Sequence, residues 1–471
     1  MSATKGRPAP AVAVVGGGWA GCAAAVELAR KGAQVTLFEA ARTLGGRARA
    51  VDLDGRLLDN GQHILLGAYT ETLNLLNRVG VDPKTALLRL PLQMRYPEGS
   101  GGMDFVAPRL PAPWHMTIAL LRSKGLERAD KMALARFWTA ARWMGWRLDT
   151  DVSVRTLLER FEQTARLQRL MWTPLCLAAL NTPPERASSN VFLAVLRDSL
   201  GAKRAASDML IPRLELSALF PQAAARYLAA QGGSVLTGAK AASLQRGPGG
   251  WSVEASGAEG RVFDAVVLAT PPAQSGALLA PFIETAELSA RLKAFEYESI
   301  ATCYLQYDAG LRLPLPFCAL LDAPEQARFG QFAFDRGQLD PAQAGLLAVV
   351  VSAAGAAAAL GQEELARAIA AQLDAAFPGL GLAAPQWSRV ITEKRATFAC
   401  TPGLQRPENM TPLAGLVLAG DYTAGDYPAT LESAVRSGQA AATVILRGNR
   451  SDGKNGSLSH GAGDGTSASV Q

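Results

Sequence analysis

The sequence predicts an α/β fold built on a Rossmann-like parallel sheet, and three stretches of the chain support this prediction. The first, residues 11–39, reads as a strand, a glycine-rich turn, a helix and a second strand. The second, FDAVVLATPP at 263–272, and the third, LVLAGD at 416–421, contain short apolar runs with the length of buried strands. Continuous Val, Leu and Ala runs are typical of parallel strands that are covered on both faces.

The overall composition fits a globular protein with more than one domain. The 471 residues exceed one ordinary core, and a 49% share of hydrophobic residues can fill large interiors. The net charge of +6 is too small for a nucleic-acid-binding arm. It suits an enzyme that meets anionic cofactors or lipid headgroups.

Several features predict where the protein resides. Five scattered cysteines, none in a CxxC pair, predict reduced thiols, with neither a disulfide framework nor a metal site. The first ten residues lack the apolar segment of a secretory signal, so we expect a cytoplasmic protein. The uncharged run 341–362 is interrupted by Gly345, Ser352 and Gly355, and it predicts a strand followed by a helix rather than a membrane span. Residues 447–471 have almost no large apolar side chain and predict a disordered tail.

A glycine-rich turn follows the first predicted strand. The segment GGGWAG places Gly16, Gly18 and Gly21 in the GxGxxG pattern, with Trp19 and Ala20 between the last two. Gly16 permits a tight turn, Gly18 lets the backbone approach a pyrophosphate, and Gly21 lets the helix pack against the strand. The N–H groups at the start of the helix face the phosphates. We therefore expect this turn to bind a dinucleotide.

An acidic residue ends the second predicted strand. Glu39 lies 18 residues after Gly21 (39 − 21), close to the spacing expected of a carboxylate that contacts an adenosine ribose. Ala40 follows it and is expected in the same contact region. An acidic residue here disfavours a 2′-phosphate and hence NADP.

A second glycine pair follows in AARTLGGRARA. A nicotinamide dehydrogenase needs no second close backbone approach there, whereas flavin adenine dinucleotide (FAD) extends past the first loop. With these motifs the chain resembles the FAD-dependent amine oxidase and carotenoid desaturase superfamily. The resemblance implies that Arg42, Gly45, Gly46 and Arg47 line the phosphate and flavin side of the cofactor.

The resemblance also assigns cofactor contacts farther along the chain. It implies that Gly420 and Asp421 lie near the ribityl and phosphate groups. The closing helix, which begins at Thr430 and Leu431, would point its N-terminus at the flavin pyrimidine edge and stabilise an anionic reduced flavin. Two further strands would contribute Val235 at the adenine and Thr270 at the dinucleotide.

The segment DNGQHILLGAY, at 59–69, joins polar side chains to an apolar run. By the same resemblance it runs along the flavin, which places Asn60, Gly61, Gln62 and His63 beside the isoalloxazine ring. Polar groups there can bond to flavin edges or donate to a substrate oxygen. The alternative is that His63 is a hydrogen-bonded core residue that only shapes the wall.

The resemblance implies a discontinuous architecture. A Rossmann-like FAD-binding domain would comprise residues 8–80, 205–275 and 395–446. An inserted α+β substrate domain of the amine oxidase type would comprise residues 81–204, mostly helical, and 276–394.

Basic and aromatic residues alternate between 112 and 147. The aromatic members are Trp114, Phe137, Trp138, Trp143 and Trp146. This mixture predicts either a helix pair at a membrane interface or an ordinary amphipathic face packed on a core, and the sequence leaves both open.

Two stretches narrow the resemblance: 180-LNTPPERASSNVFLAVLRDSL-200 and 207-SDMLIPRLELSALFPQAAARYL-228. They resemble the hydroxysqualene dehydroxylases, and the similarity extends to about Leu446. It implies reduction of hydroxysqualene to squalene in hopanoid or terpenoid biosynthesis, with the hydride from flavin N5. A long isoprenoid substrate calls for an apolar channel and for a protein peripheral on the inner face of the cytoplasmic membrane. Candidates for protonating the leaving hydroxyl are His63, Asp426 and Tyr427; the electron donor to the flavin is not indicated.

Other functions remain compatible with the same motifs. One is an FAD-dependent oxidase or desaturase acting on a polyene or an amine, for which Tyr422 and Tyr427 offer an aromatic pair. The others are a non-catalytic flavin-binding partner in a terpenoid complex and a plain NAD dehydrogenase.

Overall fold

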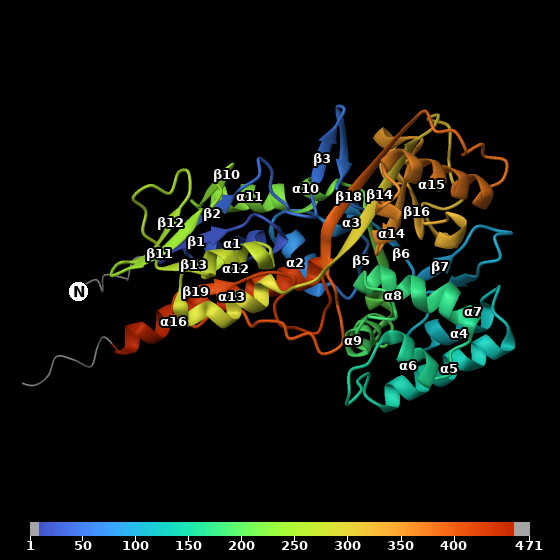
Figure 1. Cartoon of the computed structure of the whole chain (residues 1–471), viewed down its shortest axis with the longest axis horizontal. Helices are drawn as coiled ribbons and strands as arrows, with labels where there is room; N and C mark the ends of the chain where they lie inside the picture. The colour runs from blue at the N-terminus through green and yellow to red at the C-terminus, as the bar shows by residue number, and fades with distance from the viewer. Residues whose placement is uncertain (1–8, 456–471) are drawn as a thin grey trace, which may run out of the picture.

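Both ends of the chain contribute strands to one parallel sheet in the computed structural model, which describes residues 9–455 (Figure 1). The strand order is β10-β2-β1-β13-β19, and every neighbouring pair is parallel. The bounds are Ala11–Val15 (β1), Gln34–Glu39 (β2), Ser234–Thr237 (β10), Ala265–Leu268 (β13) and Leu416–Leu418 (β19). The predicted α/β class is confirmed.

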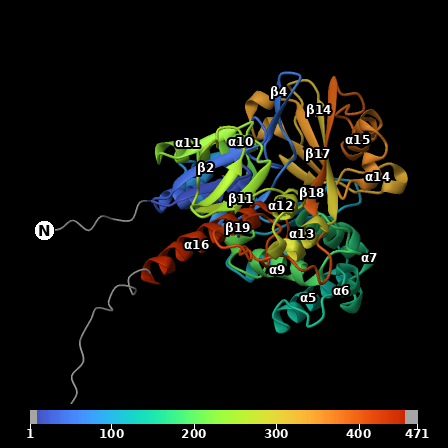
Figure 2. The same cartoon turned by 60° about the vertical axis from the view of Figure 1, so that its left-hand side comes forward.

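Two helices from opposite ends of the chain pack together on this sheet. They are α1 (Trp19–Arg30) and α16 (Leu431–Asn455), and Figure 2 shows α16 running alongside the sheet. A Cβ added to Gly438 in α16 would lie 2.2 Å from the Ala20 carbonyl oxygen in α1. Small residues thus let the two backbones approach closely. Helix α11 (Pro221–Ala230) packs against α1 and β10, and the short helix α10 (Leu216–Leu219) precedes it.

The disordered tail expected from 447 is wrong for its first part. Helix α16 continues past Leu446 to Asn455. A helix that has already formed extends at low cost, because each added residue contributes one backbone hydrogen bond without a new nucleation step. The rest of that expectation, residues 456–471, lies outside the described residues.

The second large sheet is antiparallel, with the order β15-β16-β17-β14-β18. Its strands are Tyr297–Gln306 (β14), Phe317–Ala319 (β15), Phe332–Asp335 (β16), Leu346–Ser352 (β17) and Trp387–Phe398 (β18). Helices α14 (Gly355–Ala358) and α15 (Gln362–Ala376) follow β17, and α15 covers the outer face of the sheet. The uncharged run 341–362 therefore forms a strand followed by helix, as predicted. No helix within residues 9–455 has the length and apolar character required of a membrane span.

A helical lobe lies at the end of the molecule opposite the parallel sheet (Figures 1 and 2). Its helices are α4 (Trp114–Arg122), α5 (Arg128–Trp143), α6 (Val154–Arg160), α7 (Ala165–Leu167), α8 (Thr173–Leu180) and α9 (Ser189–Ser199). The smaller elements are β3 (Ala50–Leu53), β4 (Arg56–Asp59), β5 (Leu65–Leu66), α2 (Thr70–Arg78), α3 (Pro83–Ala86), β6 (Leu87–Leu90), β7 (Gln93–Arg95), β8 (Asp104–Val106), β9 (Met209–Pro212), β11 (Ser243–Gly247) and β12 (Gly250–Glu254).

Two of the expected domain boundaries fall inside secondary structure. Helix α12 (Pro272–Leu279) crosses the boundary at 275, and it lies with α13 (Ala286–Lys293) beside the parallel sheet in both views. Strand β18 crosses the boundary at 395. Helix α12 contacts both α13 and β11, and β18 pairs with β14 while its Ala396 carbonyl oxygen accepts from Arg47.

The close approach of α1 and α16 predicts an unusual response to alanine. In a helix interior, Gly→Ala normally stabilises by about 0.5–1 kcal/mol. At Gly438 we expect the opposite, a loss of about 1–3 kcal/mol, because the new methyl group would overlap the Ala20 carbonyl oxygen. Thermal unfolding followed by circular dichroism measures the effect. Gly310→Ala, where an added Cβ meets no atom within 4 Å, is the control; equal melting temperatures for the two variants would contradict the packing described.

Candidate active site

The first glycine turn is tightly packed except at one position. A Cβ on Gly16, whose φ is +108°, would lie 2.5 Å from the Ala269 carbonyl oxygen, and a Cβ on Gly21 would lie 1.9 Å from the Gly16 carbonyl oxygen. At Gly18 the added atom would meet only the Cα of Gly46, 3.9 Å away. Gly18 is also the N-cap of α1, and no side chain caps that helix. This open backbone cradle at a helix N-terminus fits the pyrophosphate of FAD.

The two glycine loops touch backbone to backbone. The Gly45 amide donates to the Gly17 carbonyl oxygen at 2.8 Å, and Gly18 and Gly45 form a parallel bridge. A Cβ on Gly17 would lie 2.4 Å from Leu44 Cδ2. The sequence analysis did not assign a role to Gly17, although the uninterrupted run of three glycines is a signal for such crowding.

Glu39 is held at the edge of the cradle. Its Oε2 accepts from the Gly17 amide and its Oε1 from the Ala41 amide, both at 2.7 Å. These bonds orient the carboxylate at the end of β2, and each oxygen keeps a further lone pair for a ribose hydroxyl. Ala40 and Arg42 are exposed beside it. On the neighbouring strand, Val235 pairs in register with Leu37.

Arg47 joins three distant segments. Its Nη2 donates to Asp421 Oδ1 and its Nη1 to the Ala396 carbonyl oxygen, both at 2.7 Å. The Arg47 carbonyl oxygen accepts from Asn60 Nδ2 at 3.2 Å. Asp421 is buried, so its carboxylate depends on this partner. The predicted residues Arg47, Asn60 and Asp421 are thereby brought together.

The start of α16 is tied to the end of β19. Thr430 Oγ1 accepts from the Ser433 amide at 3.1 Å and caps the helix. Ser437 Oγ accepts from the Gly420 amide at 2.9 Å, which joins the predicted Gly420 to the helix that begins at Leu431. At the end of β13, Thr270 Oγ1 shares a 2.8 Å hydrogen bond with Ser275.

Both polar atoms of the Gln62 side chain have a protein partner. Its Nε2 donates to the Tyr304 hydroxyl at 2.8 Å, and its Oε1 accepts from Arg336 Nη1 at 3.0 Å. Gln62 therefore links the flavin-side segment to the antiparallel sheet. Because its Nε2 carries a second N–H, a bond from this amide to a flavin edge stays a prediction. The sequence analysis missed Tyr304 and the buried Arg336, because no local pattern places them beside residue 62.

The hydrogen bonding of His63 determines its tautomer. Its Nδ1 lies 3.0 Å from the Gly61 carbonyl oxygen, which can only accept, so Nδ1 carries the proton. Burial lowers the pKa of His63, and the charge of Arg47 lowers it further. The imidazole is therefore neutral at pH 7, with an unprotonated Nε2. This state makes His63 an acceptor and does not favour the predicted role of proton donor.

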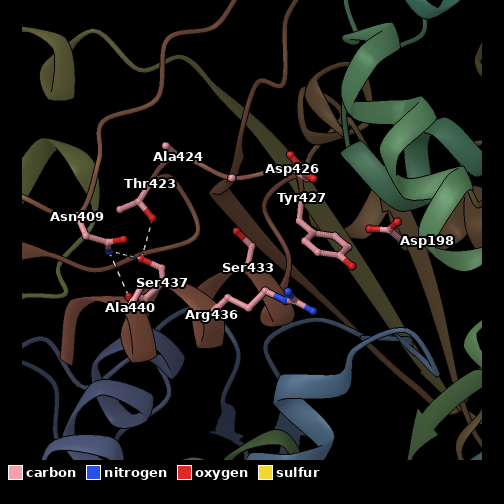
Figure 3. Close-up of a pocket in the computed structure, with 11 residues that line it drawn as sticks. Asp198, Asn409, Thr423, Ala424, Asp426, Tyr427, Ser433, Arg436, Ser437 and Ala440 are labelled. Carbon is pink, nitrogen blue, oxygen red and sulfur yellow. Dashed lines mark hydrogen bonds between the residues drawn. The ribbon is translucent and has the colours of Figure 1, made fainter. Parts of the chain in front are cut away.

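The other two candidate donors lie in a separate pocket. Asp426 and Tyr427 line a cavity of about 340 Å³ between α9 and α16, and His63 is not among its lining residues (Figure 3). The Tyr427 hydroxyl points at Asp198. Burial and the charge of Asp198 raise the pKa of Tyr427 to about 12, so it keeps its proton. The side chain of Asp426 is 69% exposed and pairs with Arg197 at 3.1 Å.

The two tyrosines expected to flank an amine do not face one space. Tyr422 is buried, its hydroxyl lies 3.1 Å from Ser275 Oγ, and its ring packs edge-on against Phe295. Tyr427 instead carries the guanidinium of Arg436 on its ring at 5.1 Å. This arrangement offers no support for an amine-binding aromatic pair.

Replacing Glu39 with alanine is expected to weaken FAD binding by roughly ten- to hundredfold. The change removes both the ribose contact and the two bonds that orient the loop. Flavin fluorescence during titration of the apoprotein gives the dissociation constant. Glu284→Ala removes an exposed carboxylate outside the site and is the control; a dissociation constant for Glu39→Ala equal to that of the control would remove Glu39 from the cofactor site.

Comparison with known proteins gives a consistent result. Residues 19–446 match the family model described as flavin containing amine oxidoreductase. The chain is 30% identical to the hydroxysqualene dehydroxylase of Rhodopseudomonas palustris, over 93% of this chain and 99% of that protein. It is 25% identical to the zeta-carotene desaturase of a Synechocystis species, over 92% and 97% of the two chains.

Solved structures show the same fold. An oxidoreductase from Methanosarcina mazei superposes with a TM-score of 0.69 at 16% identity, covering 93% of this chain and 100% of that one. Cyclohexylamine oxidase from Brevibacterium oxydans gives 0.62 at 19% identity, covering 94% and 100%. Three observations indicate FAD as the cofactor: the open cradle at Gly18, the orientation of Glu39 and the match to the family model. The chain belongs to the flavin-containing amine oxidoreductase family and is an FAD-dependent oxidoreductase.

Proposed function

We propose that this oxidoreductase reduces hydroxysqualene to squalene, as a step of hopanoid or terpenoid biosynthesis. The observation that carries the proposal is the similarity to hydroxysqualene dehydroxylases along nearly the whole of both chains, which includes the substrate-side sheet as well as the cofactor domain. Similarity confined to the cofactor motifs would support only the flavin chemistry.

The reaction breaks an allylic C–OH bond and forms a C–H bond. The hydroxyl leaves as water after gaining one proton, and a hydride takes its place on carbon, so the alcohol is reduced by two electrons. Reduced flavin supplies a hydride when FAD is bound. The protein must hold a long apolar chain, donate a proton or hydrogen bond to the leaving oxygen, and keep bulk water away from the electron-poor carbon.

One face of the antiparallel sheet carries apolar side chains that could hold a long isoprenoid chain. Phe332 and Phe334 of β16 pack against Phe317 of β15, with ring centroids 5.5 and 5.0 Å apart. These rings share a hydrophobic cluster with Tyr304, whose hydroxyl contacts the flavin-side segment at Asp59. An aromatic and aliphatic wall beside the expected flavin position suits an isoprenoid chain, and aromatic faces can stabilise a transient cation.

Incubating photoreduced enzyme with hydroxysqualene in the absence of oxygen tests the proposal. We expect the flavin absorbance to return as squalene accumulates in equal amount, measured by mass spectrometry. Enzyme whose flavin stays reduced until oxygen is admitted would contradict the proposal. Turnover of a polyene or an amine by the oxidised enzyme would instead support an oxidase or desaturase.

We also propose that the helical lobe docks on the inner face of the cytoplasmic membrane, where such a substrate dissolves. Large apolar side chains project from α4 and α5 into solvent: Trp114 is 61% exposed and Trp143 is 88% exposed, and Leu121 and Met132 are also exposed. Lys131 Nζ donates to the Leu121 carbonyl oxygen, which holds the end of α4 against the start of α5. Exposed Trp side chains on neighbouring helices are typical of membrane interfaces.

The excess of basic side chains on the same helices favours binding to an anionic membrane surface. Residues 109–147 contain eight basic side chains and two acidic ones, Glu127 and Asp130. Arg166 lies 2.6 Å from Glu127 and 3.7 Å from Asp130, so both carboxylates already have a cationic partner. The basic side chains therefore keep most of their charge for lipid headgroups.

Sedimentation with liposomes containing anionic lipid tests this docking. We expect the wild-type protein to pellet at low salt and to be released at high salt, because the attraction is screened. Replacing both Trp114 and Trp143 with serine should reduce the bound fraction severalfold. The control Ile283→Ser removes an apolar side chain that is 84% exposed outside this lobe; a wild-type protein that remains in the supernatant would refute the proposal.

A further inference from the structure

The flavin-side segment contacts two neighbouring strands of the antiparallel sheet. Tyr304 of β14 donates through its hydroxyl to the Asp59 carbonyl oxygen and accepts from Gln62 Nε2, both at 2.8 Å. Asn60 Nδ2 donates to Glu393 Oε2 of β18 at 3.4 Å. Strand β18 pairs with β14 and forms one edge of the sheet. The segment therefore lies beside this edge of the sheet, where a glutamate carboxyl reaches it.

The strand register places Glu393 on the same face of the sheet as Tyr304. Ile300 of β14 stands directly opposite Glu393 of β18. Opposed residues on paired strands share a face, and so do residues at even spacing along one strand. The alternate residues Cys303 and Val390 belong instead to the core on the other face, against α15. Glu393 thus faces the flavin-side segment rather than the interior beneath α15.

The same face carries the aromatic side chains expected to contact an isoprenoid chain. Phe334 of β16 stands opposite Ala348 of β17, and Ala348 stands opposite Tyr304. Ile300 and Ile391 are half-buried and pack against the hydrophobic cluster that contains these three side chains. The face therefore runs from aromatic side chains at one edge of the sheet to a carboxyl flanked by isoleucines at the other.

The carboxyl of Glu393 is accessible and only weakly held. The residue is half-buried, as are Asn60, Gly61 and His63 of the flavin-side segment. Its Oε1 accepts from the Arg395 amide at 3.2 Å, and its Oε2 accepts from Asn60 at 3.4 Å. Both bonds are long and both donors are neutral. Each carboxyl oxygen therefore keeps capacity for a further partner.

The other titratable groups of this segment are less suited to donate a proton to a ligand. Asp59 is buried, and its Oδ1 accepts from the Leu216 amide at 2.7 Å, at the start of α10. His63 is a neutral acceptor. The other two candidate donors line the pocket between α9 and α16. Glu393 is the carboxyl that combines an accessible surface with contact to the flavin-side segment.

We propose that Glu393 is a further catalytic residue, whose carboxyl binds the hydroxyl group of the alcohol and donates the proton with which that group leaves as water. This role rests on the proposed function. In the step, the C–O bond breaks, an O–H bond forms and the carboxyl becomes a carboxylate. The hydride supplied by reduced flavin forms the new C–H bond and carries the two electrons. Solvent returns a proton to Glu393 after the product has left.

The substrate itself favours the protonated carboxyl. A long hydrocarbon chain that packs on Ile300 and Ile391 removes water from Glu393 between them. Desolvation disfavours the charged form of a carboxyl group. The proton donor and the leaving hydroxyl then meet away from bulk water, which would otherwise trap the electron-poor carbon.

Two substitutions separate proton donation from the shape of the side chain. Glu393→Gln keeps the size and removes the acidic proton, whereas Glu393→Asp keeps the acid on a shorter side chain. In a single turnover of photoreduced holoprotein with hydroxysqualene, without oxygen, we expect Glu393→Gln to slow flavin reoxidation on the order of 10²–10⁴-fold. Glu393→Asp should regain part of this loss. The control Glu364→Gln, at an exposed carboxylate on α15, should react at the wild-type rate.

The cofactor site shows whether the role is chemical or structural. The amide oxygen of Glu393→Gln can still accept from Asn60, so its dissociation constant for FAD and its melting temperature should match those of the wild type. A slower reaction accompanied by an equal loss of FAD affinity would show that Glu393 only supports the flavin-side segment. That result would overturn the proposal.

Failure of this proposal is distinguishable from failure of the proposed function. If the wild type and Glu393→Gln convert hydroxysqualene equally fast, the role of Glu393 is refuted and the proposed function stands. If the wild type leaves hydroxysqualene unchanged and its flavin stays reduced, the proposed function is refuted, and the role of Glu393 with it.

Discussion

The hydrogen bonds of Arg47 to two different segments are the interaction on which the site depends. One guanidinium holds the buried carboxylate of Asp421 and the Ala396 carbonyl oxygen of β18, and the backbone of the same residue holds Asn60. A planar guanidinium can satisfy several acceptors in fixed directions, which the ammonium of lysine cannot do in the same way. Removing it would leave Asp421 buried without its partner, a change that is strongly destabilising in proteins.

The bonds of Arg47 also help to join the parallel sheet and the antiparallel sheet at one site. The segment from Asp59 to His63 runs between them, bonded to the cofactor domain through Asn60 and to the substrate sheet through Gln62 and Tyr304. The side chains of Asn60 and Gln62 form these hydrogen bonds, and His63 is held in one tautomer by its own. The side chains of Asn60 and Gln62 therefore have partners in the protein before any ligand binds.

The pocket between α9 and α16 contains the other two candidate proton donors, Asp426 and Tyr427. Asp426 and Tyr427 follow the closing strand of the cofactor domain, so they were natural candidates for catalysis. In the fold they turn toward the helical lobe, where Arg197 and Asp198 engage them. Asp426 is paired with Arg197 and Tyr427 with Asp198, and a catalytic role for Asp426 and Tyr427 stays a prediction.

The parallel sheet, the glycine cradle and the position of Glu39 follow from the sequence alone, because each depends on neighbours within about thirty residues and on backbone rules that glycine and short apolar runs obey. The ion pair of Arg47 with Asp421 and the hydrogen bond from Arg336 to Gln62 join residues hundreds of positions apart. No periodicity encodes such pairs. Only tertiary packing decides which of these polar groups meet.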